Sequence, residues 1–182
     1  MAANNPPERL DPLISAARIR RRVAELAREI DADYRGRAPV LVVVLKGAAI
    51  FAADLMRRLT VPVRVEFVTA ASYGAETRSS GRVDLISPKT LDLAGHDVLV
   101  VEDIIDSGLT CRTLLADLRR REPARLALCT LLHKEVGRSA VDIRYTGFDI
   151  PDKFVVGYGM DYAERYRNLP DIRVLAFSAG AR

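Results

Sequence analysis

The chain alternates continuous apolar runs with segments of helical spacing. VLVVVL (40–45) and DVLVV (97–101) are too uniformly apolar for strands with one wet face, so they predict strands buried on both faces. VRVEFV (63–68) alternates, as a half-buried strand does. The same rhythm continues in the helices LKGAAIFAADLMRRL and LTCRTLLADLRRRE and the strands ARLALCTLL, KFVVGYGM and IRVLAF. This alternation predicts an α/β fold with a mainly parallel central sheet flanked by helices.

The first predicted helix spans residues 12–34 and follows residues 1–12, an Asn- and Pro-rich segment that we expect to be a flexible tail. Its apolar residues recur at helical spacing, at Ile19, Val23, Leu26 and Ile30. Five arginines share the helix, at Arg18, Arg20, Arg21, Arg22 and Arg28. The net charge of +4 keeps a polyanionic partner open, yet we interpret these arginines as the solvated face of an amphipathic helix.

Residues 70–96 interrupt this alternation of predicted strands and helices. The segment AASYGAETRSSGRVDLISPKTLDLAGH is longer than an ordinary connection and rich in Ser, Gly and Thr. Loops of this length inside compact domains are usually functional or disordered. In an α/β enzyme, we expect this segment to be a lid.

Length and composition indicate a single domain over residues 1–182, because 49% hydrophobic residues suffice for a sizeable core. No apolar run reaches the roughly 18 residues of a membrane span, and the first residues lack the order of a secretory signal. We therefore expect a soluble, cytoplasmic protein. Cys111 and Cys129 are predicted to be buried free thiols, and the two histidines suggest no zinc site.

The stretch VLVVEDIIDSGLT (98–110) carries the strongest chemical signal. In an open parallel sheet, ligands bind beyond the carboxyl ends of the strands, where loops turn into helices. Gly108 lets the backbone approach a ligand, and Ser107 and Thr110 offer hydroxyl donors. The N-terminus of the following helix favours an anion. This turn therefore predicts a phosphate-binding site.

Three acids accompany the turn: the predicted strand ends at Glu102 and Asp103, and Asp106 follows. Carboxylates would repel a phosphate, unless they bind the hydroxyls of a sugar that carries it or a divalent cation beside it. A phosphorylated ribose satisfies both requirements. In the alternative interpretation, the acids solvate a strand end and Ser107 caps a helix. That alternative explains the serine but leaves the acids and the glycine as a coincidence.

The pattern of four apolar residues, Glu-Asp, two apolar residues, Asp, Ser-Gly, x, Thr resembles the phosphoribosyl diphosphate (PRPP) signature of the type I phosphoribosyltransferases, in its hypoxanthine-guanine form. The likeness runs from VLVVVLKG to about Arg167 and includes SYG, LLHK and FDIPDKFVVGYGMDYAERYRNLP. It implies the type I fold, with a small hood formed by terminal segments. It also implies transfer of ribose 5-phosphate from PRPP to a purine, with Mg²⁺ present and pyrophosphate released.

The resemblance assigns the PRPP-binding residues. Glu102 and Asp103 would hold the ribose hydroxyls, directly or through magnesium. The turn Asp106, Ser107, Gly108, Leu109 and Thr110 would take the 5-phosphate.

The resemblance also assigns the pyrophosphate, metal and lid positions. Lys46 and Gly47 match the pyrophosphate loop, in which we expect the Leu45–Lys46 peptide to be cis, and Arg167 matches a further pyrophosphate contact. Asp161, on the purine side, matches the second magnesium ligand. Ser72 and Tyr73 match the tip of the lid.

For the purine, Asp106 matches the general base at N7, and a carboxylate there indicates a 6-oxopurine. Lys134 matches the donor to the purine O6, which would reject adenine. Phe154 matches the ring that stacks on the purine, and Val155 supplies backbone contacts. Taken alone, Lys134 would be interpreted as a surface lysine and Phe154 as a core residue.

Two alternatives stay open at this point. A xanthine-preferring enzyme differs only around the purine edge. An RNA-binding pyrimidine regulator of the same fold is disfavoured by Asp106, because such proteins generally carry an aromatic residue there. We expect PRPP and 6-oxopurine bases as partners, no membrane or nucleic acid, and a homo-oligomer, either a dimer or a tetramer.

Overall fold

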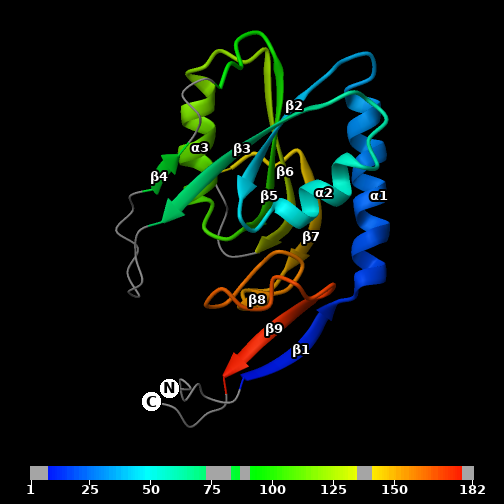
Figure 1. Ribbon diagram of the computed structural model, residues 1–182, viewed down its shortest axis with the longest axis vertical. Helices are drawn as coiled ribbons and strands as arrows, with labels where there is room; N and C mark the ends of the chain where they lie inside the picture. Colours follow the sequence, from blue (N-terminus) through cyan, green and yellow to red (C-terminus); the bar gives the residue numbers. More distant parts are fainter. Residues whose placement is uncertain (1–7, 73–82, 87–90, 135–140, 178–182) are drawn as a thin grey trace.

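A computed structural model describes residues 8–72, 83–86, 91–134 and 141–177 (Figure 1). Its central sheet has the strand order β4-β3-β2-β5-β6-β7. The bounds are β2 (Val40–Leu45), β3 (Arg64–Ser72), β4 (Val83–Ile86), β5 (Asp97–Ile105), β6 (Arg125–Lys134) and β7 (Tyr145–Ile150). Neighbouring strands from β3 to β7 pair in parallel and only β4 runs antiparallel, which confirms the predicted fold class.

Helices cover both faces of this sheet. They are α1 (Ala16–Asp33), α2 (Ala49–Met56) and α3 (Leu109–Arg119). Leu41 and Val43 of β2 pack in the cluster that contains the apolar residues of α1 and α2, whereas Val40 and Val42 pack in the cluster of α3. Because alternate residues of a strand point to opposite faces, a strand covered on both sides must be apolar throughout. This explains the uniform run VLVVVL.

A second, smaller sheet lies below the first in Figure 1, with the order β1-β9-β8. Its strands are β1 (Glu8–Ile14), β9 (Ile172–Phe177) and β8 (Val155–Val156). The prediction of a flexible tail was therefore wrong for residues 8–12, because β1 pairs antiparallel with β9 from Glu8 onward. The strand predicted over KFVVGYGM is also much shorter than expected. This sheet is the hood implied by the resemblance.

Helix α1 begins later than predicted, because its N-cap is Ser15, whose hydroxyl accepts a hydrogen bond from the Arg18 amide at 3.4 Å. Most of its arginines are exposed, as expected of a solvated face, but Arg22 is half-buried and donates to the Thr146 and Gly147 carbonyls.

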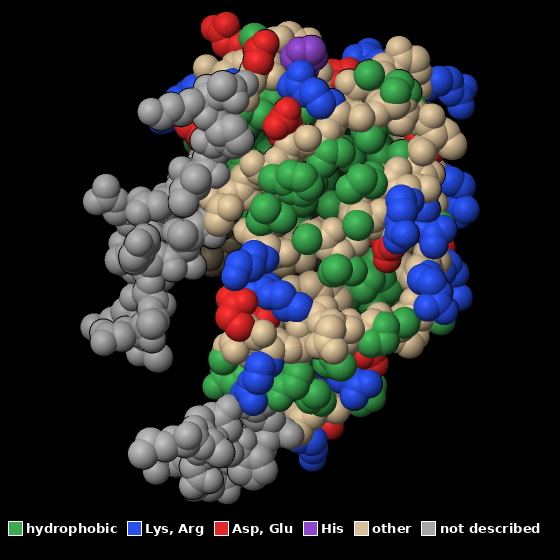
Figure 2. Space-filling model, viewed as in Figure 1, with side chains coloured by type: hydrophobic (Ala, Val, Ile, Leu, Met, Phe, Trp, Pro, Cys, Tyr) green, Lys and Arg blue, Asp and Glu red, His purple; other side chains and the backbone are tan. Residues whose placement is uncertain are grey.

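Figure 2 shows hydrophobic side chains gathered in the middle of the face where Figure 1 places α2. Ile50 on α2 and Phe67 on β3 are 45% and 47% exposed. Phe67 lies two residues from Val65, which packs against the α1 and α2 cluster, so both point to this face of the sheet. We call the surface around Ile50 and Phe67 the α2 face.

The predicted lid region contains a strand, since Ala70 of β3 pairs with Leu85 of β4. Ser72 is the last residue of β3, and Tyr73 lies outside the described residues. Cys111 and Cys129 are free and buried, as predicted. None of the helices in the described part of the chain is long and apolar enough to cross a membrane.

Candidate functional site

Strand β5 continues through the two acids, so the expectation that it ends at Glu102 and Asp103 was wrong. Its pairing with β6 extends from Glu102 to Ile105, because β6 itself runs on to Lys134. On its other side, β5 pairs with β2 only as far as Val101. Glu102 and Asp103 therefore lie in a part of β5 that still pairs with β6 but no longer pairs with β2.

The loop after β2 lies directly against these acids. A Cβ added at Gly47 would lie 1.7 Å from Asp103 Oδ2, so no other residue fits there without movement. A Cβ at Gly159, in the segment after β8, would lie 2.1 Å from the Gly47 carbonyl oxygen. The Leu45–Lys46 peptide at the start of this loop is cis, as expected. The hood, the β2 loop and the β5 acids thus form one packed layer.

Burial raises the pKa of both acids. Loss of solvation is the main cause for Glu102, and the neighbouring Asp103 carboxylate adds to it. For Asp103, burial outweighs the hydrogen bond that its Oδ1 accepts from the Ile104 amide at 2.9 Å. No described Lys or Arg forms an ion pair with either carboxylate. The pair is suited to accept hydroxyl donors or a hydrated cation.

The turn after β5 leads into α3. Gly108 is the N-cap of α3 and adopts a left-handed conformation with φ of 73°. The Ser107 hydroxyl accepts a hydrogen bond from the Leu109 amide at 3.4 Å. Gly108 itself has no side chain to cap the helix, so among the described residues the first-turn amides other than that of Leu109 are available to an anion.

Lys134, the last residue of β6, is buried between two carboxylates. Its Nζ donates to Asp106 Oδ2 at 2.7 Å and to Asp152 Oδ1 at 3.1 Å. Burial by itself lowers the pKa of Lys134, but the hydrogen bonds that it donates to Asp106 and Asp152 outweigh this effect, so the pKa is raised. Lys134 is therefore a charged donor held next to the Asp106 carboxylate.

An aromatic wall lies on the hood side. Phe154 is 49% exposed, which is unusual for a phenylalanine, and its ring meets that of Tyr162 edge to face with 5.7 Å between the centroids. Val155 follows it in β8 and is buried. The exposed face of Phe154 is available to stack on a planar ligand.

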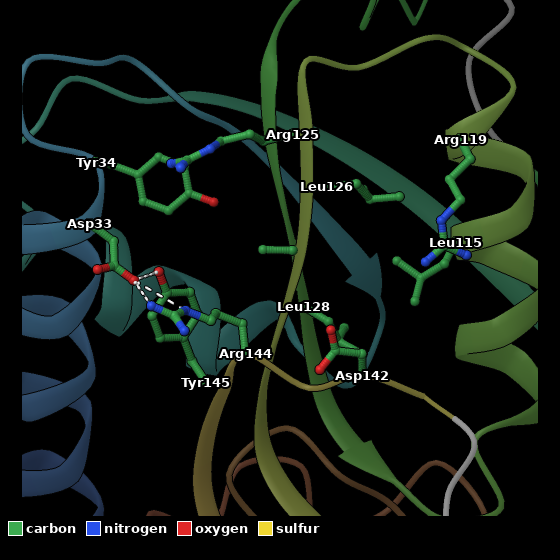
Figure 3. Close-up of a pocket in the computed structure, with 11 residues that line it drawn as sticks. Asp33, Tyr34, Leu115, Arg119, Arg125, Leu126, Leu128, Asp142, Arg144 and Tyr145 are labelled. Carbon is green, nitrogen blue, oxygen red and sulfur yellow. Dashed lines mark hydrogen bonds and ion pairs between the residues drawn. The ribbon is translucent and has the colours of Figure 1, made fainter.

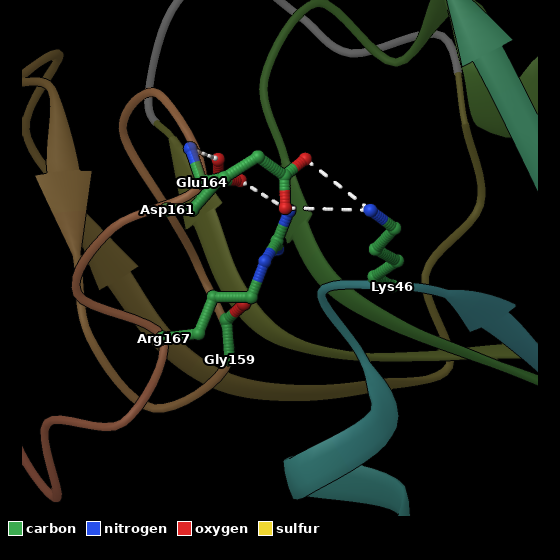
Figure 4. Close-up of polar contacts among 5 residues, drawn as sticks. All are labelled: Lys46, Gly159, Asp161, Glu164 and Arg167. Atoms are coloured by element: carbon green, nitrogen blue, oxygen red, sulfur yellow. Dashed lines mark hydrogen bonds and ion pairs between the residues drawn. The ribbon is translucent and has the colours of Figure 1, made fainter.

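Figure 4 shows a network of charged groups at the other end of the site. The Glu164 carboxylate lies 3.3 Å from Lys46 Nζ and 3.6 Å from an Arg167 nitrogen. Arg167 also contacts Asp161 Oδ1 at 2.7 Å and donates to the Gly159 carbonyl at 2.8 Å. The other Asp161 oxygen accepts from the Glu164 amide at 2.9 Å. Lys46 and Arg167, which are far apart in sequence, thus share one acidic partner.

Many of the residues described above line one cavity of about 350 Å³, a volume within the usual range for small-molecule sites. Of the predicted site residues, its lining includes Lys46, Gly47, Glu102, Asp103, Asp106, Thr110, Lys134, Phe154, Val155, Asp161 and Arg167. Ser107, Gly108 and Leu109 lie in the turn between two lining residues, Asp106 and Thr110.

The apolar lining residues Val44, Leu45 and Ile104 were not predicted as site residues, and neither were three residues nearer the C-terminus. Asp152 holds Lys134, Glu164 bridges Lys46 and Arg167, and Met160 lines the cavity. All three lie in the run FDIPDKFVVGYGMDYAERYRNLP. The charged positions in that run were the available signal, but their partners are remote in sequence.

Comparison with known proteins agrees with this geometry. The phosphoribosyl transferase domain family matches residues 13–163. A hypoxanthine-guanine phosphoribosyltransferase of Mycobacterium avium is 50% identical over 170 residues, covering 90% of this chain and 84% of that protein. The Bacillus subtilis hypoxanthine-guanine phosphoribosyltransferase is 46% identical over 165 residues, covering 90% of this chain and 91% of that protein.

Among solved structures, a hypoxanthine-guanine phosphoribosyltransferase from Bacillus anthracis has a TM-score of 0.84 at 45% identity, covering 91% of this chain and 98% of that chain. High identity over nearly the whole length and a shared fold lead to the same assignment. The chain belongs to the phosphoribosyl transferase family and, within it, to the hypoxanthine-guanine phosphoribosyltransferases.

Proposed function

We propose that the protein acts in purine salvage, transferring the 5-phosphoribosyl group of PRPP to hypoxanthine or guanine and releasing IMP or GMP and pyrophosphate. The observation that carries this proposal is the contact of Lys134 with Asp106, 2.7 Å apart in the lining of a cavity that Phe154 also lines. A 6-oxopurine presents an acceptor at O6 beside a protonated nitrogen at N7. Lys134 and Asp106 are the complementary donor and acceptor.

In the proposed reaction, purine N9 forms a bond to C1′ of the ribose while the bond from C1′ to the pyrophosphate oxygen breaks. Asp106 accepts the N7 proton, or stabilises it there, as N9 becomes nucleophilic. Lys134 donates to O6, and Phe154 stacks on the ring, with backbone contacts from Val155. The proton ends on Asp106 and the electron pair of the broken bond leaves with pyrophosphate.

For PRPP, the proposal assigns each end of the molecule to a different element. Glu102 and Asp103 bind the ribose hydroxyls, and the turn from Asp106 to Thr110 takes the 5-phosphate at the N-terminus of α3. The charges of Lys46 and Arg167 neutralise pyrophosphate, and the Gly47 backbone contacts it. In binding pyrophosphate, the two cations give up their contact with Glu164. Ser72 and Tyr73 remain the proposed lid tip.

Mg²⁺ would neutralise charge on the departing pyrophosphate. Glu102 and Asp103 suit it, because they are buried carboxylates without an ion-pair partner among the described residues. Asp161 would have to share its oxygens with Arg167 and the Glu164 amide. No group of three His, Cys, Asp or Glu in the described residues forms an all-protein cage, which agrees with the preference of Mg²⁺ for one or two carboxylates, waters and substrate oxygens.

We also propose a cytoplasmic homo-oligomer, a dimer or a tetramer. The α2 face supports this, since Ile50 and Phe67 expose apolar surface that a second copy would bury. A xanthine-preferring enzyme is the second candidate, but no observation favours it. An RNA-binding role is less consistent with a carboxylate at Asp106 ion-paired to Lys134.

A spectrophotometric assay with PRPP, Mg²⁺ and each purine in turn tests the function. We expect turnover of hypoxanthine or guanine and essentially none of adenine. Lys134→Met should lower kcat/KM for hypoxanthine by about 10- to 100-fold, the worth of a hydrogen bond from a charged group. Lys153→Met is the matched control, because Lys153 is an exposed lysine that does not line the cavity. Comparable turnover of adenine and hypoxanthine would contradict the proposal.

A further inference from the structure

A second cavity, of about 340 Å³, is nearly as large as the candidate active site but lies at the opposite end of the strands, where β6 and β7 begin (Figure 3). Its lining includes Arg125 and Leu126 at the start of β6, whereas Lys134 ends the same strand at the active site. Nine residue steps along a strand span about 30 Å. A ligand in this cavity would not touch the groups proposed for catalysis.

The cavity exists because β7 is shorter than β6. The two strands pair only from Cys129 and Tyr145 onward, so no described strand pairs with residues 125–128 of β6 on that side. The last backbone link is the Arg144 amide, which donates to the Leu128 carbonyl at 3.0 Å. The space beyond it lies between the end of α1 and α3, with Leu115 and Leu128 as buried apolar wall residues.

Tyr34 points a hydrogen-bonding group into this space. The residue as a whole is only 3% exposed, and no described residue is its hydrogen-bond partner; its hydroxyl is not among the fully buried polar atoms, so it lies at the surface of the cavity. In Figure 3 the hydroxyl points away from α1 toward β6. Burial is the main cause that raises the pKa of Tyr34, so the group stays a neutral donor. The hydroxyl is therefore accessible from the cavity, where water or a ligand can bind it.

Some charged groups of the lining have hydrogen-bond or ion-pair partners, and others form no ion pair with a described residue. Asp33 is satisfied by Arg144 at 2.8 Å and by the Tyr145 hydroxyl at 2.8 Å. Arg119 and Arg125 form no ion pair with any residue that the structure describes, and neither does Asp142. All three are exposed, and Figure 3 shows Arg125 beside Tyr34 and Arg119 on the α3 side, so each guanidinium is available separately. Arginine forks bind carboxylates and phosphates through paired hydrogen bonds.

We propose that this cavity is a binding site for a small organic anion, a phosphate or carboxylate on an apolar or aromatic body. Arg125 would bind the anionic group, the Tyr34 hydroxyl beside it would donate to it, and Leu126 and Leu128 would contact the body, with Leu115 and Arg119 on the α3 side of the cavity. The volume equals that of about eleven waters at roughly 30 Å³ each, which admits a single-ring ligand. Asp142 would accept from a donor on the ligand and would disfavour a bare polyanion.

The test is a titration of the full-length protein with phenyl phosphate, benzoate and benzyl alcohol, followed by amide NMR. The signals of residues 125–128 report on this cavity, and those of residues 107–110 report separately on the phosphate turn of the active site. We expect phenyl phosphate or benzoate to shift the first set with saturation, and benzyl alcohol to bind at least about tenfold more weakly. Tighter binding of phenyl phosphate identifies a phosphate ligand, and tighter binding of benzoate a carboxylate.

Two variants and one control locate the site. Arg125→Gln and Tyr34→Phe should each weaken the anion at residues 125–128, by about tenfold or more for the arginine. Arg120 lies next to Arg119 in the chain but does not line the cavity. Arg120→Gln removes the same charge and should change the affinity for the anion little. Tyr34→Phe keeps the buried ring, so its Tm should stay close to that of the wild type.

Three results would overturn the proposal: no saturable shift at residues 125–128, equal binding of benzyl alcohol, or equal loss in Arg120→Gln and Arg125→Gln. None of them depends on purine turnover. A failed salvage assay with a positive titration, or the reverse, therefore separates this inference from the proposed function.

Discussion

Lys134 Nζ lies 2.7 Å from Asp106 Oδ2, although the two residues are 28 positions apart in the chain. In this arrangement, the donor and the acceptor proposed for the purine neutralise each other before a base binds. A 6-oxopurine inserted between them would accept from Lys134 and donate to Asp106. Each charged group would exchange one polar partner for another, so neither would be left buried and unsatisfied.

This relationship makes Asp106→Asn an informative change. Asparagine keeps the shape and one acceptor but removes the basicity, so kcat should fall by roughly 10² to 10⁴. PRPP affinity should change far less, because the backbone of the turn and the N-terminus of α3 remain. Single-turnover rates and a directly measured Kd for PRPP distinguish chemistry from binding. Near-normal single-turnover rates would show that Asp106 is a ligand of the phosphate turn and not the base.

Asp152→Asn should have a smaller effect that is specific to the purine. Asp152 holds Lys134 at 3.1 Å, but its side chain is 62% exposed, so the interaction is worth only about 0.2–1 kcal/mol. We expect kcat/KM for hypoxanthine to fall about two- to fivefold, with the Kd for PRPP unchanged. Asp149→Asn is the matched control, because Asp149 is similarly exposed and pairs with His133 instead. An equal effect of both changes would remove Asp152 as a positioning residue.

The double change Glu102→Gln with Asp103→Asn should weaken PRPP and Mg²⁺ binding more than the chemical step. It should also stabilise the protein without ligand, because it removes two neighbouring buried carboxylates. Their pKa is raised in the folded state, so the wild type is destabilised as pH rises above their ordinary pKa.

Thermal unfolding with and without PRPP and Mg²⁺ at two pH values checks this prediction. The difference in Tm between variant and wild type should be larger at pH 8 than at pH 5, by roughly 2–4 °C for each kcal/mol. A variant that is less stable than the wild type at pH 8 would mean that the two carboxylates stabilise the ligand-free fold.

Glu164→Gln should strengthen pyrophosphate binding a few-fold. Glu164 is fully exposed, and Lys46 is the main cause that lowers its pKa, so the two groups attract each other across the site. Removing the charge frees Lys46 for the anion and leaves Arg167 with Asp161 as its one carboxylate partner among the described residues, and the gain should shrink at high salt. Calorimetric titration with pyrophosphate measures it, with Glu66→Gln on β3 as a control away from the cavity. Weaker binding in Glu164→Gln would indicate that Glu164 orients the two cations.

The sequence by itself determined the elements and the local motifs. VLVVVL predicted a strand covered on both faces because its apolar character is continuous, and the turn at Ser107 and Gly108 predicted an anion site because its residues are adjacent. Apolar periodicity and turn chemistry act between neighbours in the chain, so they can be recognised without a fold. Most of the residues assigned by resemblance also line one cavity.

Only the tertiary structure decided the interactions between distant segments. The extension of β5 through Glu102 depends on β6 as its partner, and residues 8–12 form a strand only because β9 lies beside them. The contact of Asp152 with Lys134 and the position of Glu164 between Lys46 and Arg167 also depend on the tertiary structure. So does the second cavity, which forms because β7 begins beyond the first residues of β6. Hydrogen-bonded ladders and ion pairs require the partner in space, and no pattern along the chain specifies which partner arrives.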